Sequence, residues 1–574
     1  MSTGAQLSNL TPLRYDFVVG TTQLAINKAM FNYIQGTNFS TVQVCWTADD
    51  NGEPVVGDCN TLLDATGVKF FNLGNTTVAA GSTMYNQLAE SNFFGAMQIK
   101  IGVPEGVNVS ALPDIVNLQG GTSDIAFQMY AKEFNIVWWN GNVFKPGYES
   151  VMQDPKYPWI YNATINLDFQ STAVDSFGKL PPAVKAQVNN LQASGLAFSV
   201  EQLLFDLATP ALDGTPPSLH GLGIVPGTTI DELLNEAMLP AYVAAMKAAG
   251  TPVLGLGVVP TSGPISSLNM TAFNFDVQPY FSSTGGPIFN PTLVEQELYA
   301  LNYLCVTDGA TLPPTSPLGW NWVDQSQLAN GQTPSGGAIA IARNQFAATL
   351  TSMLSPVANR MALPIPRITV VTQGTTFLFG LEFNENPNPS PIFVGPSSTS
   401  GTNITSWTFA ASSSDHSGAS GAPTATVALN TNYTMTVEFI GTTAPLVKIT
   451  QHMVAFASVK VLASVASGNI YDKTHVDTYA ISAHGGPQLI VAHTTALQDN
   501  SMVPTATPFD IDGINNAIKS LISIVEGKID PLLNTALPVN LVQSFIFPGG
   551  STFNYSNAVF SQHQDLVASI NYRI

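Results

Sequence analysis

Histidine and aspartate residues in the last quarter of the chain are the side chains best suited to chemistry. The chain has seven histidines, and His475, His484 and His493 follow one another at intervals of nine residues. Side chains alternate between the two faces of a β-strand, so this odd interval gives them no shared face of one strand. No H-x-H or H-x₃-H pair occurs, and we predict no metal site. Asp472, His475 and Asp477 would suit acid–base work or calcium, and polar residues at a strand end explain them equally well.

Sequence motifs of the common enzyme classes are missing from the chain. There is no G-x-S-x-G elbow, P-loop, HExxH or CxxC. The G-x-G triplets at 221–223 and 255–257 lack the third glycine of a dinucleotide fingerprint, and we interpret both as turns. The segment DIDG at 510–513 is similar to the start of a calcium loop, but the later ligands are missing and helix capping is the better interpretation. We therefore predict a protein that is not an enzyme and holds no cofactor.

Apolar side chains remain as the candidate site, and the clearest group lies in a helix predicted over 508–537. Its apolar residues recur at steps of three or four, which line one helix face: Ile511, Ile514, Ile518, Leu521, Val525, Ile529 and Leu532. We predict an apolar groove between this helix and a sheet, lined by Ile518, Leu521, Ile522 and Val525, with a smaller space beside Met30 and Ile34. The same side chains would serve equally well as a dry core, and sequence alone does not separate the two.

The elements of the first half follow from periodicity and capping residues. A helix is predicted over 22–35, capped by Thr21 or Thr22, and another over 229–249. A change of phase within an alternating run predicts a β-bulge near Lys132. The remaining predicted elements are strands at 97–103, 125–138 and 161–169, and short helices at 181–192 and 198–208.

The second half is predicted in the same way. Helices are expected over 291–303 and 338–361, in addition to the closing helix. A stretch rich in Ser, Gly and Asn at 396–424 predicts an exposed loop. Alternating runs predict the strands, at 273–277, 377–383, 433–465, 471–496 and 566–573.

The order of these elements predicts an α+β fold with two modules of helix, sheet and helix. The division is 1–260 for the first module, 261–335 for a connecting region and 336–574 for the second module. A long apolar helix followed by amphipathic strands indicates that the sheet wraps around the helix. We therefore expect elongated, strongly curved antiparallel sheets around long amphipathic helices. A single elongated module with a large central insertion stays open.

Two segments resemble a known superfamily. The closing order of PLLNTALP, FPGG and YSNAVFSQHQDLVASINY, within 508–574, resembles the last segment of tubular lipid-binding (TULIP) proteins, which include the bactericidal/permeability-increasing group. The stretch YDFVVGTTQLAINKAMFNYI, from Tyr15 to Ile34, is similar to the opening of the clostridial P-47 and OrfX proteins, TULIP members encoded beside toxin genes. The resemblance implies a TULIP-like fold, acyl chains held in a helix–sheet channel, and no catalytic residues.

Composition narrows the class of partner. The chain has 574 residues, a formal net charge of −19 and only 10% charged residues, against about 25% in typical soluble domains. A scarcity of Lys and Arg argues against nucleic acid and against electrostatic docking on anionic lipid. The sequence contains no run of 18 apolar residues, so we predict no transmembrane helix. The start, MSTGAQLSNL, lacks the pattern of a signal peptide, so we expect the protein to be cytoplasmic as synthesised. Release by a route that needs no signal peptide stays open.

The three cysteines are Cys45, Cys59 and Cys305. An odd count does not suit a disulfide framework. We expect buried thiols, and pairing of Cys45 with Cys59 stays open.

Two functions follow from these observations. The first is binding of a lipid or another apolar ligand in a groove between helix and sheet. The second, implied by the resemblance to P-47 and OrfX proteins, is a role as an accessory component of a toxin or virulence complex that acts through protein–protein contact.

Overall fold

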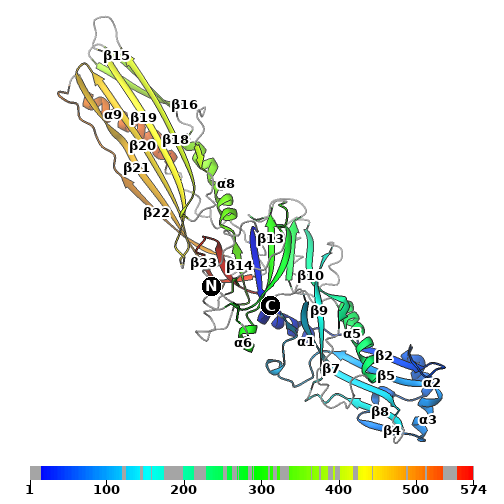
Figure 1. Ribbon diagram of the computed structural model, residues 1–574. Helices are drawn as coiled ribbons and strands as arrows, with labels where there is room; N and C mark the ends of the chain where they lie inside the picture. The colour runs from blue at the N-terminus through cyan, green and yellow to red at the C-terminus, as the bar shows by residue number, and fades with distance from the viewer. Residues whose placement is uncertain are drawn as a thin grey trace.

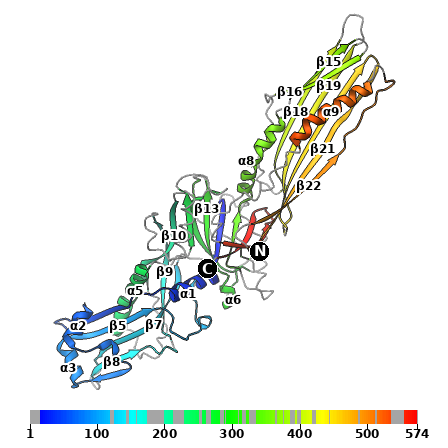
Figure 2. The same cartoon turned by 180° about the vertical axis from the view of Figure 1, so that it is seen from behind.

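The fold is described from a computed structural model, in which the chain forms an elongated body whose described strands make up three large sheets and one two-stranded sheet (Figure 1; Figure 2 from behind). It describes all residues except 1–14, 119–123, 142–145, 157, 173–197, 212–227, 250–254, 261–267, 269, 282–286, 289, 308–309, 314–319, 324–334, 363–364, 374–375, 385–391, 395–400, 418–423, 443, 486–488, 511–513, 534–552 and 573–574. All strand pairs named below are antiparallel. The predicted α+β class is confirmed in this form.

One end of the body is built on a ten-stranded sheet, here the N-terminal sheet, with the order β11-β10-β9-β7-β5-β2-β3 and β4, β6 and β8 beside it. Its strands are β2 (Val42–Ala48), β3 (Pro54–Gly57), β4 (Thr76–Ala79), β5 (Phe93–Ile101), β6 (Val116–Asn117), β7 (Asp124–Asn140), β8 (Gly147–Met152), β9 (Ile160–Thr172), β10 (Phe198–Ala211) and β11 (Gly255–Pro260). Its helices are α1 (Gln23–Gly36), α2 (Cys59–Thr66), α3 (Thr83–Glu90) and α5 (Thr229–Ala249), with short 3₁₀ turns η2 (Phe70–Asn72) and η3 (Val109–Ala111).

The middle of the body is a six-stranded central sheet that joins distant parts of the chain. Its order is β12 (Met270–Gln278), β13 (Ala300–Thr307), β1 (Phe17–Thr22), β14 (Gly337–Ile341), β24 (Leu566–Tyr572) and β23 (Phe553–Phe560). Val19 on β1 lies opposite Tyr303 on one side and Ile339 on the other. The short helix α6 (Leu293–Gln296) precedes β13. Strands from all three predicted ranges meet in this sheet, and the predicted division into modules stays a prediction.

The other end carries a second six-stranded sheet, here the distal sheet. Its order is β17 (Ile392–Val394), β18 (Asn403–Ser417), β19 (Ala425–Ile440), β20 (Leu446–Val461), β21 (Ser464–Ser482) and β22 (Ile490–Asp499). A hairpin of β15 (Ile365–Gln373) and β16 (Thr376–Asn384) and the helices α8 (Arg343–Ala362) and α9 (Ile514–Leu533) belong to the same half. Burial alternates residue by residue along β19 and β20, and along β21 except for one change of phase at Ile470 and Tyr471. One face of the sheet, here the inner face, is therefore packed, and the other, the outer face, is more open.

Several predicted elements are confirmed. The helix predicted at 22–35 is α1, and Thr22 caps it by accepting a hydrogen bond from the Ala25 amide at 3.3 Å. Those at 229–249 and 508–537 correspond to α5 and α9, and residues 508–510 precede α9 instead of belonging to it. The bulge near Lys132 is present, because Glu133 pairs with Lys100 while Ala131 pairs with Ile101. Strong periodicity and side-chain capping depend on residues that are close in sequence, so predictions based on them agree with the folded structure.

Other elements differ from the prediction. The range 198–208 is not a helix but part of β10, and the range 396–424 contains β18 rather than only a loop. The helix predicted at 291–303 is the four-residue α6 followed by β13, and the one at 338–361 starts later, at Arg343 after β14. In each case pairing with a distant strand outweighs local helix propensity or loop composition. The helix predicted at 181–192 lies outside the described residues.

A disulfide links Cys45 on β2 to Cys59 at the start of α2, so the expectation of buried thiols is wrong for this pair and holds for the buried Cys305. The link closes a loop with a sequence separation of 14 residues. Turn residues bring β3 back onto β2, with Cys45 opposite Gly57, and this brings the two sulfurs together.

The pairing predicts a specific alkylation pattern. Denatured without reductant, the protein should take up one iodoacetamide group, on Cys305; after reduction it should take up three, one for each cysteine. Intact-mass spectrometry under both conditions measures this. Three groups without reductant would contradict the link, and peptide mapping identifies the modified positions.

Candidate functional site

Helix α9 carries four of the residues predicted to line a groove. Ile518, Leu521 and Val525 have 0% exposure, and Ile522 is half-buried. The helix packs against β16, β20 and β21, and its buried residues recur at steps of three and four, as the sequence indicates up to Ile529. The last buried residue is Leu533, whereas the predicted Leu532 is half-buried. The three fully buried side chains belong to the main hydrophobic core. The structure thus brings them together at the helix–sheet interface, and contact with a ligand stays a prediction.

Met30 and Ile34, the other predicted pair, lie on α1 beside the N-terminal sheet and are also buried. Two amide side chains fix this helix. Asn27 exchanges two hydrogen bonds with the backbone of Val116, at 2.7 and 2.8 Å, and Gln23 accepts from the Leu118 amide at 2.7 Å. Met30 and Ile34 follow Asn27 at helical spacing and therefore share its face. They belong to the same continuous hydrophobic core as the buried α9 residues.

The inner face of β21 has a polar character that most of the inner face of β20 lacks. Five successive inner-facing residues carry polar atoms, and we call them the polar stripe: Tyr471, Lys473, His475, Asp477 and Tyr479. Strand β20 places Met453, Ile449 and Val447 directly opposite members of the stripe, and these three are also buried. Polar and apolar side chains therefore lie side by side within one buried surface.

The first two residues of the polar stripe are bound to α9. Lys473 Nζ donates to both carboxylate oxygens of Asp530, at 3.0 and 3.3 Å, and the Tyr471 hydroxyl donates to Asp530 Oδ1 at 2.7 Å. Glu526 and Asp499 lie 3.7 and 3.8 Å from the same ammonium. Burial, together with the bond to Asp530, raises the pKa of Tyr471, so its hydroxyl stays a donor. Carboxylates surround a lysine side chain that is only 10% exposed, as a buried charge requires.

The next residues of the stripe form a cluster around Asp477, whose side chain has 0% exposure. Its Oδ1 lies 2.8 Å from His493 Nε2 and accepts from the Thr495 hydroxyl at 2.6 Å. His475 Nδ1 is 3.9 Å from Oδ2 of Asp477, too far for a hydrogen bond. The Tyr479 ring stacks on His493 with centroids 4.6 Å apart. Burial and then the charge of Asp477 raise the pKa of Tyr479, which keeps that hydroxyl protonated.

This cluster was missed from the sequence, although two of its histidines were singled out. His475 and His493 lie on neighbouring strands, β21 and β22, and the register that sets Tyr479 opposite His493 and Asp477 opposite Thr495 brings them together. The three acidic and histidine residues 472, 475 and 477 lie inside β21, not at a strand end. Asp472 bonds His452 at 2.9 Å, away from the cluster. One signal in the sequence could have indicated this cluster: polar residues occupy both alternating sets of positions in the run YDKTHVDTY, so some of them must face the interior.

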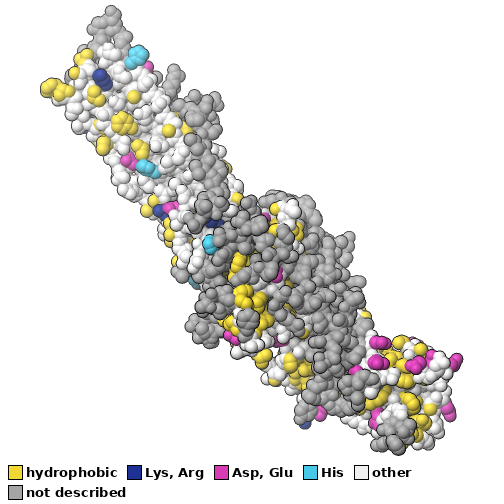
Figure 3. Space-filling view, viewed as in Figure 1, with side chains coloured by type: hydrophobic (Ala, Val, Ile, Leu, Met, Phe, Trp, Pro, Cys, Tyr) yellow, Lys and Arg dark blue, Asp and Glu magenta, His cyan; other side chains and the backbone are white. Residues whose placement is uncertain are grey.

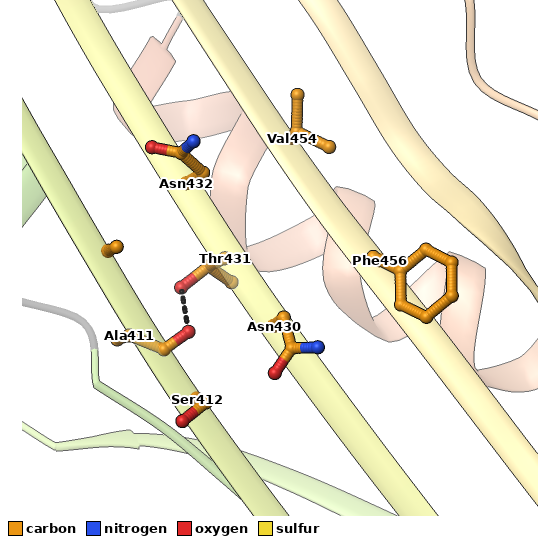
Figure 4. A pocket seen from close by; sticks show the side chains of 8 residues that line it. Ala411, Ser412, Asn430, Thr431, Asn432, Val454 and Phe456 are labelled. Carbon is orange, nitrogen blue, oxygen red and sulfur yellow. Dashed lines mark hydrogen bonds between the residues drawn. The ribbon is translucent and has the colours of Figure 1, made fainter.

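A shallow hollow of about 390 Å³ lies on the outer face of the distal sheet, with α9 behind the sheet (Figure 4). Short side chains of β18 leave room there beside the amides of Asn430 and Asn432 and the ring of Phe456, which is 37% exposed. The hollow is lined by Ala410, Ala411, Ser412, Asn430, Thr431, Asn432, Val454 and Phe456. It lies across the sheet from the predicted groove and contains none of the predicted residues.

Among the described residues, neither side-chain clusters nor helices show the features of a metal site or of a membrane span. Within the described ranges, no group of three or more His, Cys, Asp and Glu side chains is arranged to hold a metal ion. Nor does any helix described by the structure combine the length and hydropathy needed to cross a bilayer. On the face seen in Figure 3, acidic side chains gather over the end that carries α2 and α3, and basic side chains are sparse.

Comparison with known proteins gives a loose structural likeness. No protein-family model and no curated protein matches this sequence. Among solved structures, the chain is similar to a crystal structure of lipopolysaccharide binding protein, at 8% identity, over 97% of this chain and 99% of that one, with a TM-score of 0.30. Correspondence this loose carries no argument about function. The resemblance to P-47 and OrfX proteins has no match and stays a prediction.

Proposed function

We propose that the protein binds a lipid or another apolar ligand, without catalysis, between α9 and the inner face of the distal sheet. The observation that carries this proposal is the exposure of the inner face at the sheet's edge. Leu497 on β22 lies opposite the buried His475 and so points to the inner side, yet it is 56% exposed. An exposed apolar side chain at the margin of the buried inner face, next to the polar stripe, is a natural place for an acyl chain to enter.

The flank of α9 that faces this edge supports the same route. Glu526 and Asp530 of α9 and Asp499 of the edge strand all lie close to the ammonium of Lys473. Ile522 precedes Glu526 by one helical turn and therefore shares this flank. It is half-buried, so the apolar surface of the helix continues past its buried face. The curved sheets, the wrapped helices and the two-module arrangement belong to this proposal as its framework.

The margin can be tested with two aspartate substitutions on neighbouring residues. Leu497→Asp should weaken binding of a fluorescent fatty acid about tenfold, because a charge replaces apolar contact surface. Ala496→Asp is the matched control, since Ala496 is exposed on the outer face of the same strand, and it should bind like the unaltered protein. Organic extraction followed by mass spectrometry should show co-purifying lipid.

A negative result in both binding tests would contradict the proposed function. No extracted lipid together with no saturable uptake of the probe would remove lipid binding. It would favour the second function, contact with a protein partner in a larger complex. Strand β22 is the terminal strand of the distal sheet in the described topology, and such an edge is a place where a partner strand can add.

A further inference from the structure

The polar stripe begins at a break in the sheet. The register between β20 and β21 shifts between Ala455 and Phe456. Before the shift, inner-facing residues of β21 are small or apolar: Ser464, Ala466, Gly468 and Ile470. After it they are the residues of the polar stripe. The change in character along one strand face divides the interior beneath α9 from the interior beyond its C-terminal end, where Lys473 meets Asp530.

The interior beyond that point is amphipathic across its width. Strands β19 and β20 supply buried apolar side chains: Met435, Val437, Phe439, Val447 and Ile449. Strands β21 and β22 supply the polar stripe and the residues paired with it. Phe439 stacks on Phe346 of α8 and on Phe560 of β23, at 5.1 and 5.0 Å between centroids. These rings bound the apolar side toward the central sheet.

Within the described part of the chain, four buried polar atoms in this region have no hydrogen-bond partner. They are Gln451 Nε2, His475 Nδ1, Asp477 Oδ2 and the Tyr479 hydroxyl. Gln451 on β20 lies directly opposite His475 on β21. The four atoms therefore come from three successive inner-facing positions along these two strands. Buried polar atoms in folded proteins are almost always paired, and four on one inner surface indicate that a polar group belongs among them.

We propose that these four residues form the headgroup site of the ligand, and that the ligand is a neutral amphiphile bearing hydroxyl groups. This inference rests on the proposed function and specifies its ligand. Asp477 Oδ2 requires a donor, whereas Gln451 Nε2 and the Tyr479 hydroxyl offer hydrogens and require acceptors. A hydroxyl group donates and accepts at once. The acyl chain then extends from this site along the apolar side formed by β19 and β20, toward the interface of β20 with α9.

The local charge selects against an anionic headgroup. Asp477 faces the site directly, and its carboxylate would repel a second carboxylate or a phosphate in a buried setting. The ammonium that could compensate, Lys473, is already held by Asp530, with Glu526 and Asp499 close by. A glycerol-like headgroup meets the hydrogen-bonding needs without adding charge.

The test compares two lipids that share one acyl chain. Monooleoylglycerol and oleate are titrated at pH 8 against a bound fluorescent apolar probe, and native mass spectrometry confirms the stoichiometry. The unaltered protein should bind monooleoylglycerol with about tenfold higher affinity than oleate, because oleate loses a favourable polar contact or makes an unfavourable one. Equal affinities would overturn the headgroup site while leaving lipid binding intact, whereas no binding of either lipid would overturn the proposed function itself.

Two substitutions locate the preference on the chain. Tyr479→Phe removes only a hydroxyl, keeps the ring on His493, and should weaken monooleoylglycerol about fivefold without changing oleate. Asp477→Asn should strengthen oleate and bring the ratio of affinities toward one. Thr478→Val, which removes a hydroxyl from the outer face of the same strand, should leave the ratio unchanged. An unchanged ratio in Tyr479→Phe would overturn the site, even where circular dichroism shows that Asp477→Asn fails to fold.

Discussion

Replacing Leu521 by aspartate is expected to unfold the distal half of the protein or to lower its stability by at least about 4 kcal/mol. Leu521 has 0% exposure at the centre of α9, between Ile518 and Val525 on the buried face. The substitution removes a buried apolar side chain, worth about 2–5 kcal/mol when truncated, and adds a carboxylate that has no partner there. Urea unfolding followed by far-UV circular dichroism measures the loss.

The matched control lies two residues further along the same helix. Ser523 is exposed, so Ser523→Asp adds the same charge to α9 without burying it. We expect a change within about 0.5 kcal/mol, as is usual for surface substitutions. If Leu521→Asp unfolded at the same urea concentration as Ser523→Asp, the helix could not be packed as described, and the groove proposed beneath it would lose its wall.

Elements with a strong local signal could be predicted from the sequence. The stripe of apolar residues in α9 and the capping threonine of α1 are encoded within a few neighbouring residues, and both helices form where these signals place them. The bulge at Lys132 is local as well, since a change of alternation phase reports it directly.

Elements that depend on distant pairing could not be predicted. Strand β14 lies between β1 and β24 in the central sheet, and the sequence of 338–342 alone fits the start of the helix that follows. The same holds for β10, whose residues 198–208 suit a helix until they pair with β9 and β11. Strand propensity is decided by neighbours on both sides, and these lie far away in sequence.

The candidate site divides in the same way. Ile518, Leu521 and Val525 were found because helical spacing marks them, and their burial agrees with that spacing. The cluster around Asp477 was missed because its members come from two strands whose register cannot be known in advance. The interval of 18 residues between His475 and His493 says little, because the two histidines lie on different strands. The polar residues on the inner phase of β21 were visible in the sequence, but only the sheet shows that they are buried.

Removing the carboxylate of Asp565 is expected to destabilise the junction between the central sheet and the distal half by about 3 kcal/mol. Asp565 has 0% exposure just before β24, and its Oδ1 accepts from the backbone amide of Arg343, the first residue of α8, at 3.1 Å. A carboxylate at this position caps the helix and meets the positive end of its dipole. Ser561 donates to Oδ2 at 3.3 Å and holds the carboxylate in place.

The same carboxylate lies beside a buried cation. Arg343 is 2% exposed, and its Nη2 donates to the backbone oxygens of Gly401 and Asn403 at 2.7 and 3.3 Å, next to β18. Burial lowers the pKa of Arg343, and the charge of Asp565 acts in the opposite direction. Asp565→Ala therefore leaves a buried guanidinium without its neighbouring negative charge, which typically costs about 3–5 kcal/mol where the pair is fully buried.

Two further variants separate the helix cap from the charge. Asp565→Asn keeps an oxygen acceptor for the Arg343 amide and loses only the charge, so it should recover about 1 kcal/mol of the loss in Asp565→Ala, the worth of one hydrogen bond. Gln562→Ala, at an exposed position in the same turn, should change stability by less than about 0.5 kcal/mol. Urea midpoints for all three variants give the comparison. Equal midpoints for Asp565→Ala and Gln562→Ala would mean that Asp565 does not join α8 to the central sheet, and α8 would then be held by its apolar face alone.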